Sequence, residues 1–72
     1  MARYAVVGLG RFGRTLVEFL VKEGKEVIAI DKNSDIVEDV KEMVARAICM
    51  DGTDEDALMA QELNKVDVLI AC

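Results

Sequence analysis

Residues 6–16 read VVGLGRFGRTL, and the three glycines in this stretch decide the fold. Gly8, Gly10 and Gly13 form the pattern G-x-G-x-x-G between an apolar run and a helix-like segment. Taken alone, the pattern is weak evidence. It gains meaning when a strand precedes it, a helix follows it, and an acidic residue ends the next strand.

The neighbouring segments supply that context. Residues 3–7 (RYAVV) are typical of a short strand, and residues 11–23 of a helix that Gly24 is expected to end. Residues 26–31 (EVIAID) are β-branched and mostly apolar, as in a strand buried on both faces. Apolar residues at helical spacing predict the buried face of the helix: Phe12, Leu16, Phe19 and Leu20.

The remaining chain repeats this alternation. Asn33 and Ser34 are residue types that begin helices, and residues 45–50 are expected to form a weaker third strand. Thr53 is expected to cap a third helix, and residues 66–71 to form a fourth strand. The predicted core positions are Ile36, Val37, Val40 and Met43 in the second helix and Leu58, Met59 and Leu63 in the third.

The order β-α-β-α-β-α-β predicts an α/β fold with a Rossmann-like parallel sheet. Right-handed crossovers favour the strand order 3-2-1-4, with the first two helices on one face and the third on the other. Residues 1–72 are expected to form a single partial nucleotide-binding domain, because a chain of this length builds one small core.

Composition excludes several classes of function. Apolar residues make up 53% of the chain, yet no run approaches the roughly 20 residues of a membrane helix. No signal peptide is visible, so the protein is expected in the cytoplasm. The net charge of −5 and the lack of a basic stripe argue against nucleic acid. Histidine is absent and there are only two cysteines, so neither a metal site nor catalysis is expected.

The glycine pattern has a chemical meaning in this context. Gly8 permits the tight turn, Gly10 lets a pyrophosphate approach the backbone, and Gly13 lets the helix pack closely on the sheet. The free N–H groups at the start of that helix would hold phosphates. Asp31, which ends the second strand, would accept hydrogen bonds from ribose hydroxyls and repel a 2′-phosphate. The expected ligand is therefore NAD(H) or an adenine nucleotide rather than NADP.

Other residues near the pattern carry two interpretations each. Arg11 can reach a terminal phosphate or remain solvated. Phe12 is expected to pack in the core, and Lys32 to be a solvated charge that slightly weakens the exclusion of NADP. Residues 51–53 follow the third strand, so they either border the adenosine or simply form a turn and a helix cap.

The segments GLGRFGRTL, EVIAIDKN, MDGTDEDAL and VDVLIA together resemble the RCK domain, also called the KTN or TrkA N-terminal domain. Met50 and Gly52 depart mildly from the family's Gly-Asp-Ala-Thr turn. The chain is expected to cover about the first half of the family's nucleotide-binding lobe. The resemblance implies that Gly8, Gly10, Arg11 and Gly13 meet the phosphates, Asp31 the ribose, and Asp51, Gly52 and Thr53 the adenosine. It also implies that the backbone around Cys72 approaches the ligand. Leu9, Phe12 and Lys32, next to these positions, complete the predicted cofactor-binding residues.

The same resemblance implies a non-catalytic sensor of NAD(H), ATP or ADP at the cytoplasmic face of a potassium channel or transporter. Dimers or rings of subunits would move the pore gate. We expect a homodimer formed through the third helix or the edge of the fourth strand, and similar affinities for NAD and for ADP, ATP or AMP. Two alternatives remain open at this stage: the cofactor half of an NAD-dependent oxidoreductase, and a scaffold that binds no nucleotide.

Overall fold

The computed structural model describes residues 2–51, 56, 60 and 65–72. The predicted third helix, with its cap Thr53 and its core positions Leu58, Met59 and Leu63, lies outside the described residues, although Asp56 and Ala60 are helical. The described elements are, in chain order, β1 (Arg3–Val7), α1 (Arg11–Lys22), β2 (Glu26–Asp31), α2 (Ser34–Val40), β3 (Arg46–Cys49) and β4 (Val68–Ala71).

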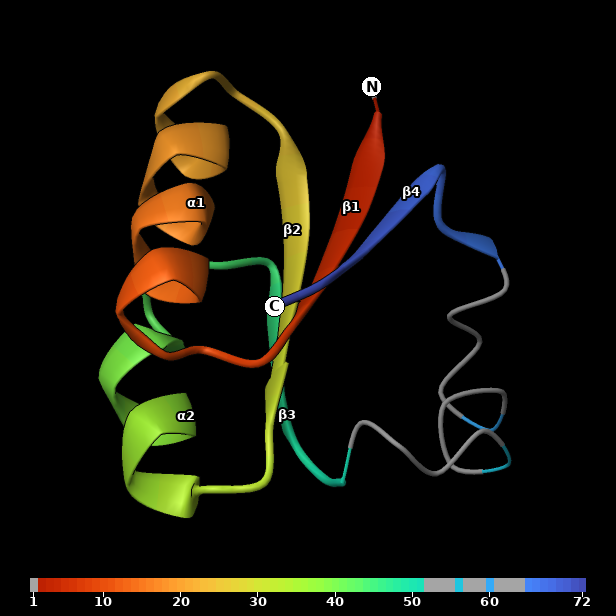
Figure 1. Ribbon diagram of the computed structural model, residues 1–72. Coiled ribbons are helices and arrows are strands. Elements are labelled where there is room, and N and C mark those ends of the chain that lie inside the picture. Colours follow the sequence, from red (N-terminus) through yellow and green to blue (C-terminus); the bar gives the residue numbers. More distant parts are fainter. Residues whose placement is uncertain (1, 52–55, 57–59, 61–64) are drawn as a thin grey trace.

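The strands form one sheet in the order β3-β2-β1-β4, and every neighbouring pair is parallel. The predicted strand order is thus confirmed. α1 and α2 lie together on one face of the sheet, as expected (Figure 1). Because the strands are parallel, their carboxyl ends meet at one edge, where Val7 of β1 lies between Ile30 of β2 and Ala71 of β4.

The two central strands are buried on both faces, which explains their nearly continuous apolar sequences. Side chains alternate between the faces along each strand. Ala5 of β1 packs with Ile28 and Ile30 of β2 in one cluster. The other cluster joins the sheet to α1 and α2 and contains Val6, Leu9, Val17, Leu20, Val27, Ala29 and Val40.

The predicted buried face of α1 is partly wrong. Phe12 is 72% exposed and Phe19 57% exposed, whereas the buried positions are Gly13, Val17 and Leu20. The error has a physical cause. A glycine adds nothing to an apolar stripe, yet Gly13 is a buried position of α1, where the helix packs against the Gly8 carbonyl in the turn after β1.

Both helices have the predicted end signals. Gly24 has a φ of +78° and donates its N–H to the Val21 carbonyl at 3.0 Å, while the N–H of Lys25 reaches the Leu20 carbonyl at 3.0 Å. This pair of bonds is a Schellman motif, and it ends α1. At the start of α2, the side-chain oxygen of Asn33 accepts the N–H of Asp35 at 2.9 Å.

Candidate functional site

Two of the three glycines are required by close packing of the turn between β1 and α1. Gly8 has a φ of +92°, and a Cβ there would lie 2.8 Å from the carbonyl oxygen of Cys72. A Cβ on Gly13 would lie only 2.0 Å from the carbonyl oxygen of Gly8. The turn is therefore held between the end of β4 and the first turn of α1, with no room for a side chain at either position.

Gly10 differs from its neighbours because a Cβ there would meet no atom within 4 Å among the described residues. Gly10 is the N-cap of α1, and no side chain in the described part of the chain caps the helix there. The first N–H groups of a helix have no partner within the helix. The start of α1 therefore offers amide donors and a positive dipole end beside open space, which suits an anion.

Asp31 is half-buried at the end of β2, and its carboxylate contacts the glycine turn directly. Its Oδ2 accepts the N–H of Leu9 at 2.7 Å, and its Oδ1 accepts the N–H of Asn33 at 2.8 Å. The acidic residue and the glycine turn, 22 residues apart in the chain, thus lie within one hydrogen bond of each other.

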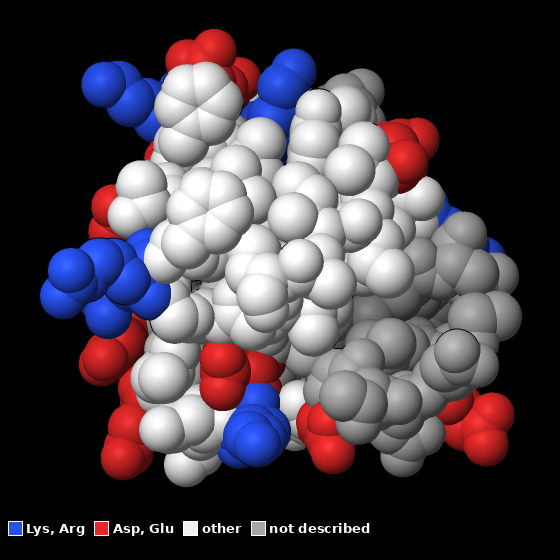
Figure 2. All heavy atoms as spheres, viewed as in Figure 1, with Lys and Arg blue, Asp and Glu red and all other residues white. Residues whose placement is uncertain are grey.

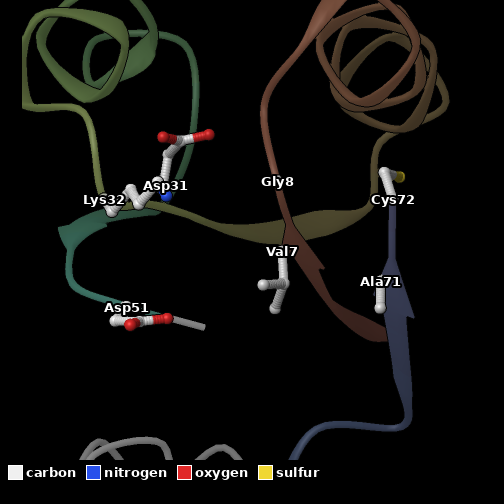
Figure 3. A pocket seen from close by; sticks show the side chains of 7 residues that line it. All are labelled: Val7, Gly8, Asp31, Lys32, Asp51, Ala71 and Cys72. Carbon is white, nitrogen blue, oxygen red and sulfur yellow. The ribbon is translucent and has the colours of Figure 1, made fainter. Parts of the chain in front are cut away.

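A pocket of about 350 Å³ opens at the carboxyl ends of the strands. In Figure 3, Asp31, Lys32 and Asp51 lie on one side of it, Ala71 and Cys72 on the other, and Val7 and Gly8 between them. From β1 the chain builds β2 and β3 on one side, and it then returns to place β4 on the other side of β1. Ligands of open α/β sheets bind in the crevice at such a switch point.

The comparison with known families decides the assignment. A family model described as the TrkA-N domain matches residues 4–72. The chain belongs to the TrkA-N domain family.

Curated relatives carry the same domain. The chain is 39% identical to Ktr system potassium uptake protein C of Bacillus subtilis (strain 168) over 67 residues, 93% of this chain and 30% of that protein. It is 34% identical to Ktr system potassium uptake protein A of Vibrio alginolyticus over 68 residues, 94% of this chain and 31% of that protein. This TrkA-N domain therefore spans about a third of the length of the relatives it matches.

The structure brings four of the predicted ligand residues together around the pocket: Gly8, Asp31, Lys32 and Asp51. Cys72, which the resemblance implied, also lines it. Gly52 and Thr53 lie outside the described residues. Among the described residues, five predicted positions do not line the pocket but form the turn and the start of α1 above it: Leu9, Gly10, Arg11, Phe12 and Gly13.

Leu9 differs most from an ordinary ligand contact. Its side chain is 2% exposed and belongs to the core of the TrkA-N domain, so only its backbone faces Asp31. Arg11 and Phe12 are both exposed at the first positions of α1. Phe12 therefore belongs to the surface beside the turn rather than to the core.

Two pocket residues were not predicted, Val7 and Ala71. Both are apolar and carry no chemical signal. Their positions do follow from the parallel register, because Val7 is the last residue of β1 and pairs with Ala71 of β4. Counting the last residue of each strand next to the switch point would have found them.

One face of the TrkA-N domain has few charged side chains at its centre. On the face in Figure 2, acidic and basic side chains lie around the rim and uncharged ones fill the middle. Val68 and Leu69 of β4 are 38% and 52% exposed. Within the described part of the chain, no helix is long and apolar enough to cross a membrane.

Proposed function

We propose that this TrkA-N domain is a regulatory, non-catalytic module of a potassium transport system that binds an adenine nucleotide: NAD(H), ATP, ADP or AMP. The observation that carries the proposal is the start of α1 beside the pocket lined by Asp31 and Asp51. Among the described residues, no side chain caps the helix there and no atom lies within 4 Å of a Cβ placed on Gly10. The names of the relatives, which are potassium uptake proteins, support the transport context.

Each part of the nucleotide has a counterpart in the chain. The N–H groups at residues 10–13 hold the phosphates, and Arg11 adds a guanidinium for a terminal phosphate. Asp31 accepts a ribose hydroxyl, because a carboxylate has about four acceptor positions and the two backbone bonds use only two of them. Asp51, together with Gly52 and Thr53, borders the adenosine.

The pocket also supports a preference against NADP. Asp31 and Asp51 are both pocket residues, and Lys32 is the cation between them in the lining. A 2′-phosphate would approach the Asp31 carboxylate, which carries the same sign of charge. The oxidoreductase alternative is less well supported, because the relatives are named as potassium uptake proteins.

A nucleotide panel tests the proposal. ADP, ATP, NAD and NADH should each stabilise the chain against heat, and saturation at 100 times the Kd should raise the free energy of unfolding by about 2.7 kcal/mol. In calorimetric titration, the Kd values for ADP and NAD should lie within about tenfold of each other, which is 1.4 kcal/mol. NADP should bind more weakly than NAD.

The outcomes separate the parts of the proposal. If no adenine nucleotide changes the melting temperature, the domain is a scaffold and the nucleotide proposal is wrong. If NAD binds more than tenfold tighter than ADP, the chain has contacts for the nicotinamide half and the proposed adenosine site is incomplete.

We propose further that the domain works as a homodimer, located in the cytoplasm and docked on a membrane subunit of the transporter. Val68 and Leu69 are exposed apolar residues of β4, the outer strand of the sheet within the described residues, and they support this assembly because apolar patches favour association. Analytical ultracentrifugation at micromolar concentration should give a dimer mass. A folded monomer throughout this range would contradict the homodimer.

A further inference from the structure

We propose that Asp31 is a positioning residue for the glycine turn: its carboxylate, bonded to the Leu9 N–H, holds the turn in the shape that receives phosphates. This inference rests on the proposed nucleotide site and adds a second role to the ribose contact. It assigns to Asp31 an effect on parts of the ligand that the carboxylate does not contact.

The end of β2 holds two successive amides of the turn. The Gly8 N–H donates to the Ile30 carbonyl at 2.9 Å, and the Leu9 N–H donates to Asp31 Oδ2 at 2.7 Å. The next residue, Gly10, is already the N-cap of α1, and its carbonyl accepts the Arg14 N–H at 2.8 Å. Of these three bonds, only the one at Leu9 depends on a side chain.

The shape of the turn is confined from the other side as well. The Leu9 side chain is buried in the core, and Gly13 packs against the Gly8 carbonyl. Without Asp31 Oδ2, the Leu9 N–H loses its partner in a half-buried place, and an unsatisfied donor there is unfavourable. The backbone from Leu9 to Gly10 would then rotate to find another acceptor, and the amides at the start of α1 would leave their positions.

The second oxygen extends the same link to the neighbouring loops. Oδ1 accepts the Asn33 N–H at 2.8 Å, and Asn33 in turn caps α2. The main-chain carbonyl of Asp31 accepts the Met50 N–H at 3.0 Å at the end of β3. Asp31 therefore joins the turn after β1, the start of α2 and the end of β3, all at the edge of the sheet where the pocket lies.

For removal of the Asp31 carboxylate, a positioning role predicts the opposite change in phosphate affinity from the one that charge repulsion alone predicts. Removing a carboxylate near phosphates relieves repulsion and should tighten the binding of an anion. A carboxylate that serves only as a ribose acceptor should leave ligands without ribose hydroxyls unaffected. A positioning residue, in contrast, should weaken phosphate binding when it is removed, even for a ligand with no ribose hydroxyls.

The experiment compares ADP with 2′,3′-dideoxy-ADP by calorimetric titration of the wild type, Asp31→Ala, Asp31→Asn and Asp35→Asn. We expect Asp31→Ala to weaken both ligands at least tenfold. Asp31→Asn keeps one acceptor oxygen and the shape of the side chain, so it should lose less affinity for the two ligands than Asp31→Ala does. Asp35→Asn is the matched control, since it removes the same charge from an exposed carboxylate in the first turn of α2, and it should bind both ligands as the wild type does.

Amide hydrogen exchange gives a readout that general destabilisation does not mimic. In Asp31→Ala, the Leu9 amide should lose protection while the Gly8 and Arg14 amides keep theirs. Unchanged exchange at Leu9, or undiminished affinity of Asp31→Ala for dideoxy-ADP, would overturn the positioning role. So would a wild type that binds ADP but not the dideoxy analogue. A wild type that binds neither ligand refutes the proposed function itself.

Discussion

Replacing Gly13 by alanine is expected to lower the free energy of unfolding by about 2 kcal/mol. The added Cβ would lie 2.0 Å from the carbonyl oxygen of Gly8, and this atom belongs to the backbone of a turn already confined by Cys72. Overpacking typically costs about 1–3 kcal/mol and sometimes more, and a rigid backbone neighbour places Gly13 at the upper end. The helix-forming advantage of alanine over glycine, about 1 kcal/mol, offsets only part of this cost.

Urea denaturation measures the effect, and Gly10→Ala is the matched control. The two substitutions add the same methyl group three residues apart, but a Cβ at Gly10 meets nothing within 4 Å among the described residues. Gly10→Ala should therefore change stability by less than about 1 kcal/mol, the usual range for an N-cap. If Gly13→Ala is as stable as the wild type, the close approach of α1 to the turn is wrong.

The bounds of the two central strands could be predicted to the residue, because strands that are buried on both faces have apolar residues at nearly every position. β1 and β2 occupy the predicted ranges 3–7 and 26–31. Each has a partner on both sides and apolar residues toward both faces. The outer strands are shorter than the predicted 45–50 and 66–71: β3 lacks one residue at each end, and β4 begins two residues later. Backbone bonds from Ala45, Met50 and Asp67 still reach the neighbouring strands, so the prediction is wrong only at the strand ends.

The face of α1 could not be predicted from apolar residues alone. Which side of a helix is buried depends also on where its backbone packs closely on other backbone, and α1 packs in this way at Gly13, against the Gly8 carbonyl. The spacing of apolar residues predicts Phe12 and Phe19 on the buried face of the helix, yet both are exposed. A rule that treats the third glycine of the pattern as a buried position would have turned the helix correctly.

The candidate site also has a part that could be predicted from the sequence and a part that could not. Strand ends and the glycine spacing bring Gly8, Asp31, Lys32 and Asp51 to one edge from the topology alone. The bond from the Leu9 N–H to Asp31 could not be predicted, because it depends on the exact rotation of one peptide in the turn. The predicted topology indicates which residues lie near each other. A single hydrogen bond depends in addition on the packing around Gly8 and Gly13.

Replacing Gly10 by valine is expected to weaken ADP binding more than tenfold while the fold remains intact. The backbone at Gly10, with a φ of −67° and a ψ of −170°, is extended and accepts any residue. The side chain would enter the open space at the start of α1, where phosphates are proposed to meet the amides. Tenfold corresponds to 1.4 kcal/mol, which the loss of a single charge-assisted hydrogen bond would account for.

Calorimetric titration measures the loss of affinity for ADP. Gly10→Ala should lose less affinity than Gly10→Val, because the alanine side chain is shorter. Thr15→Val serves as the matched control on the same helix: Thr15 is exposed one turn further on, where its hydroxyl donates to the Arg11 carbonyl at 3.0 Å, away from the cap. Its affinity for ADP should equal that of the wild type. A folded Gly10→Val chain that still binds ADP with unchanged affinity would place the phosphates elsewhere, and the start of α1 would then have no part in binding.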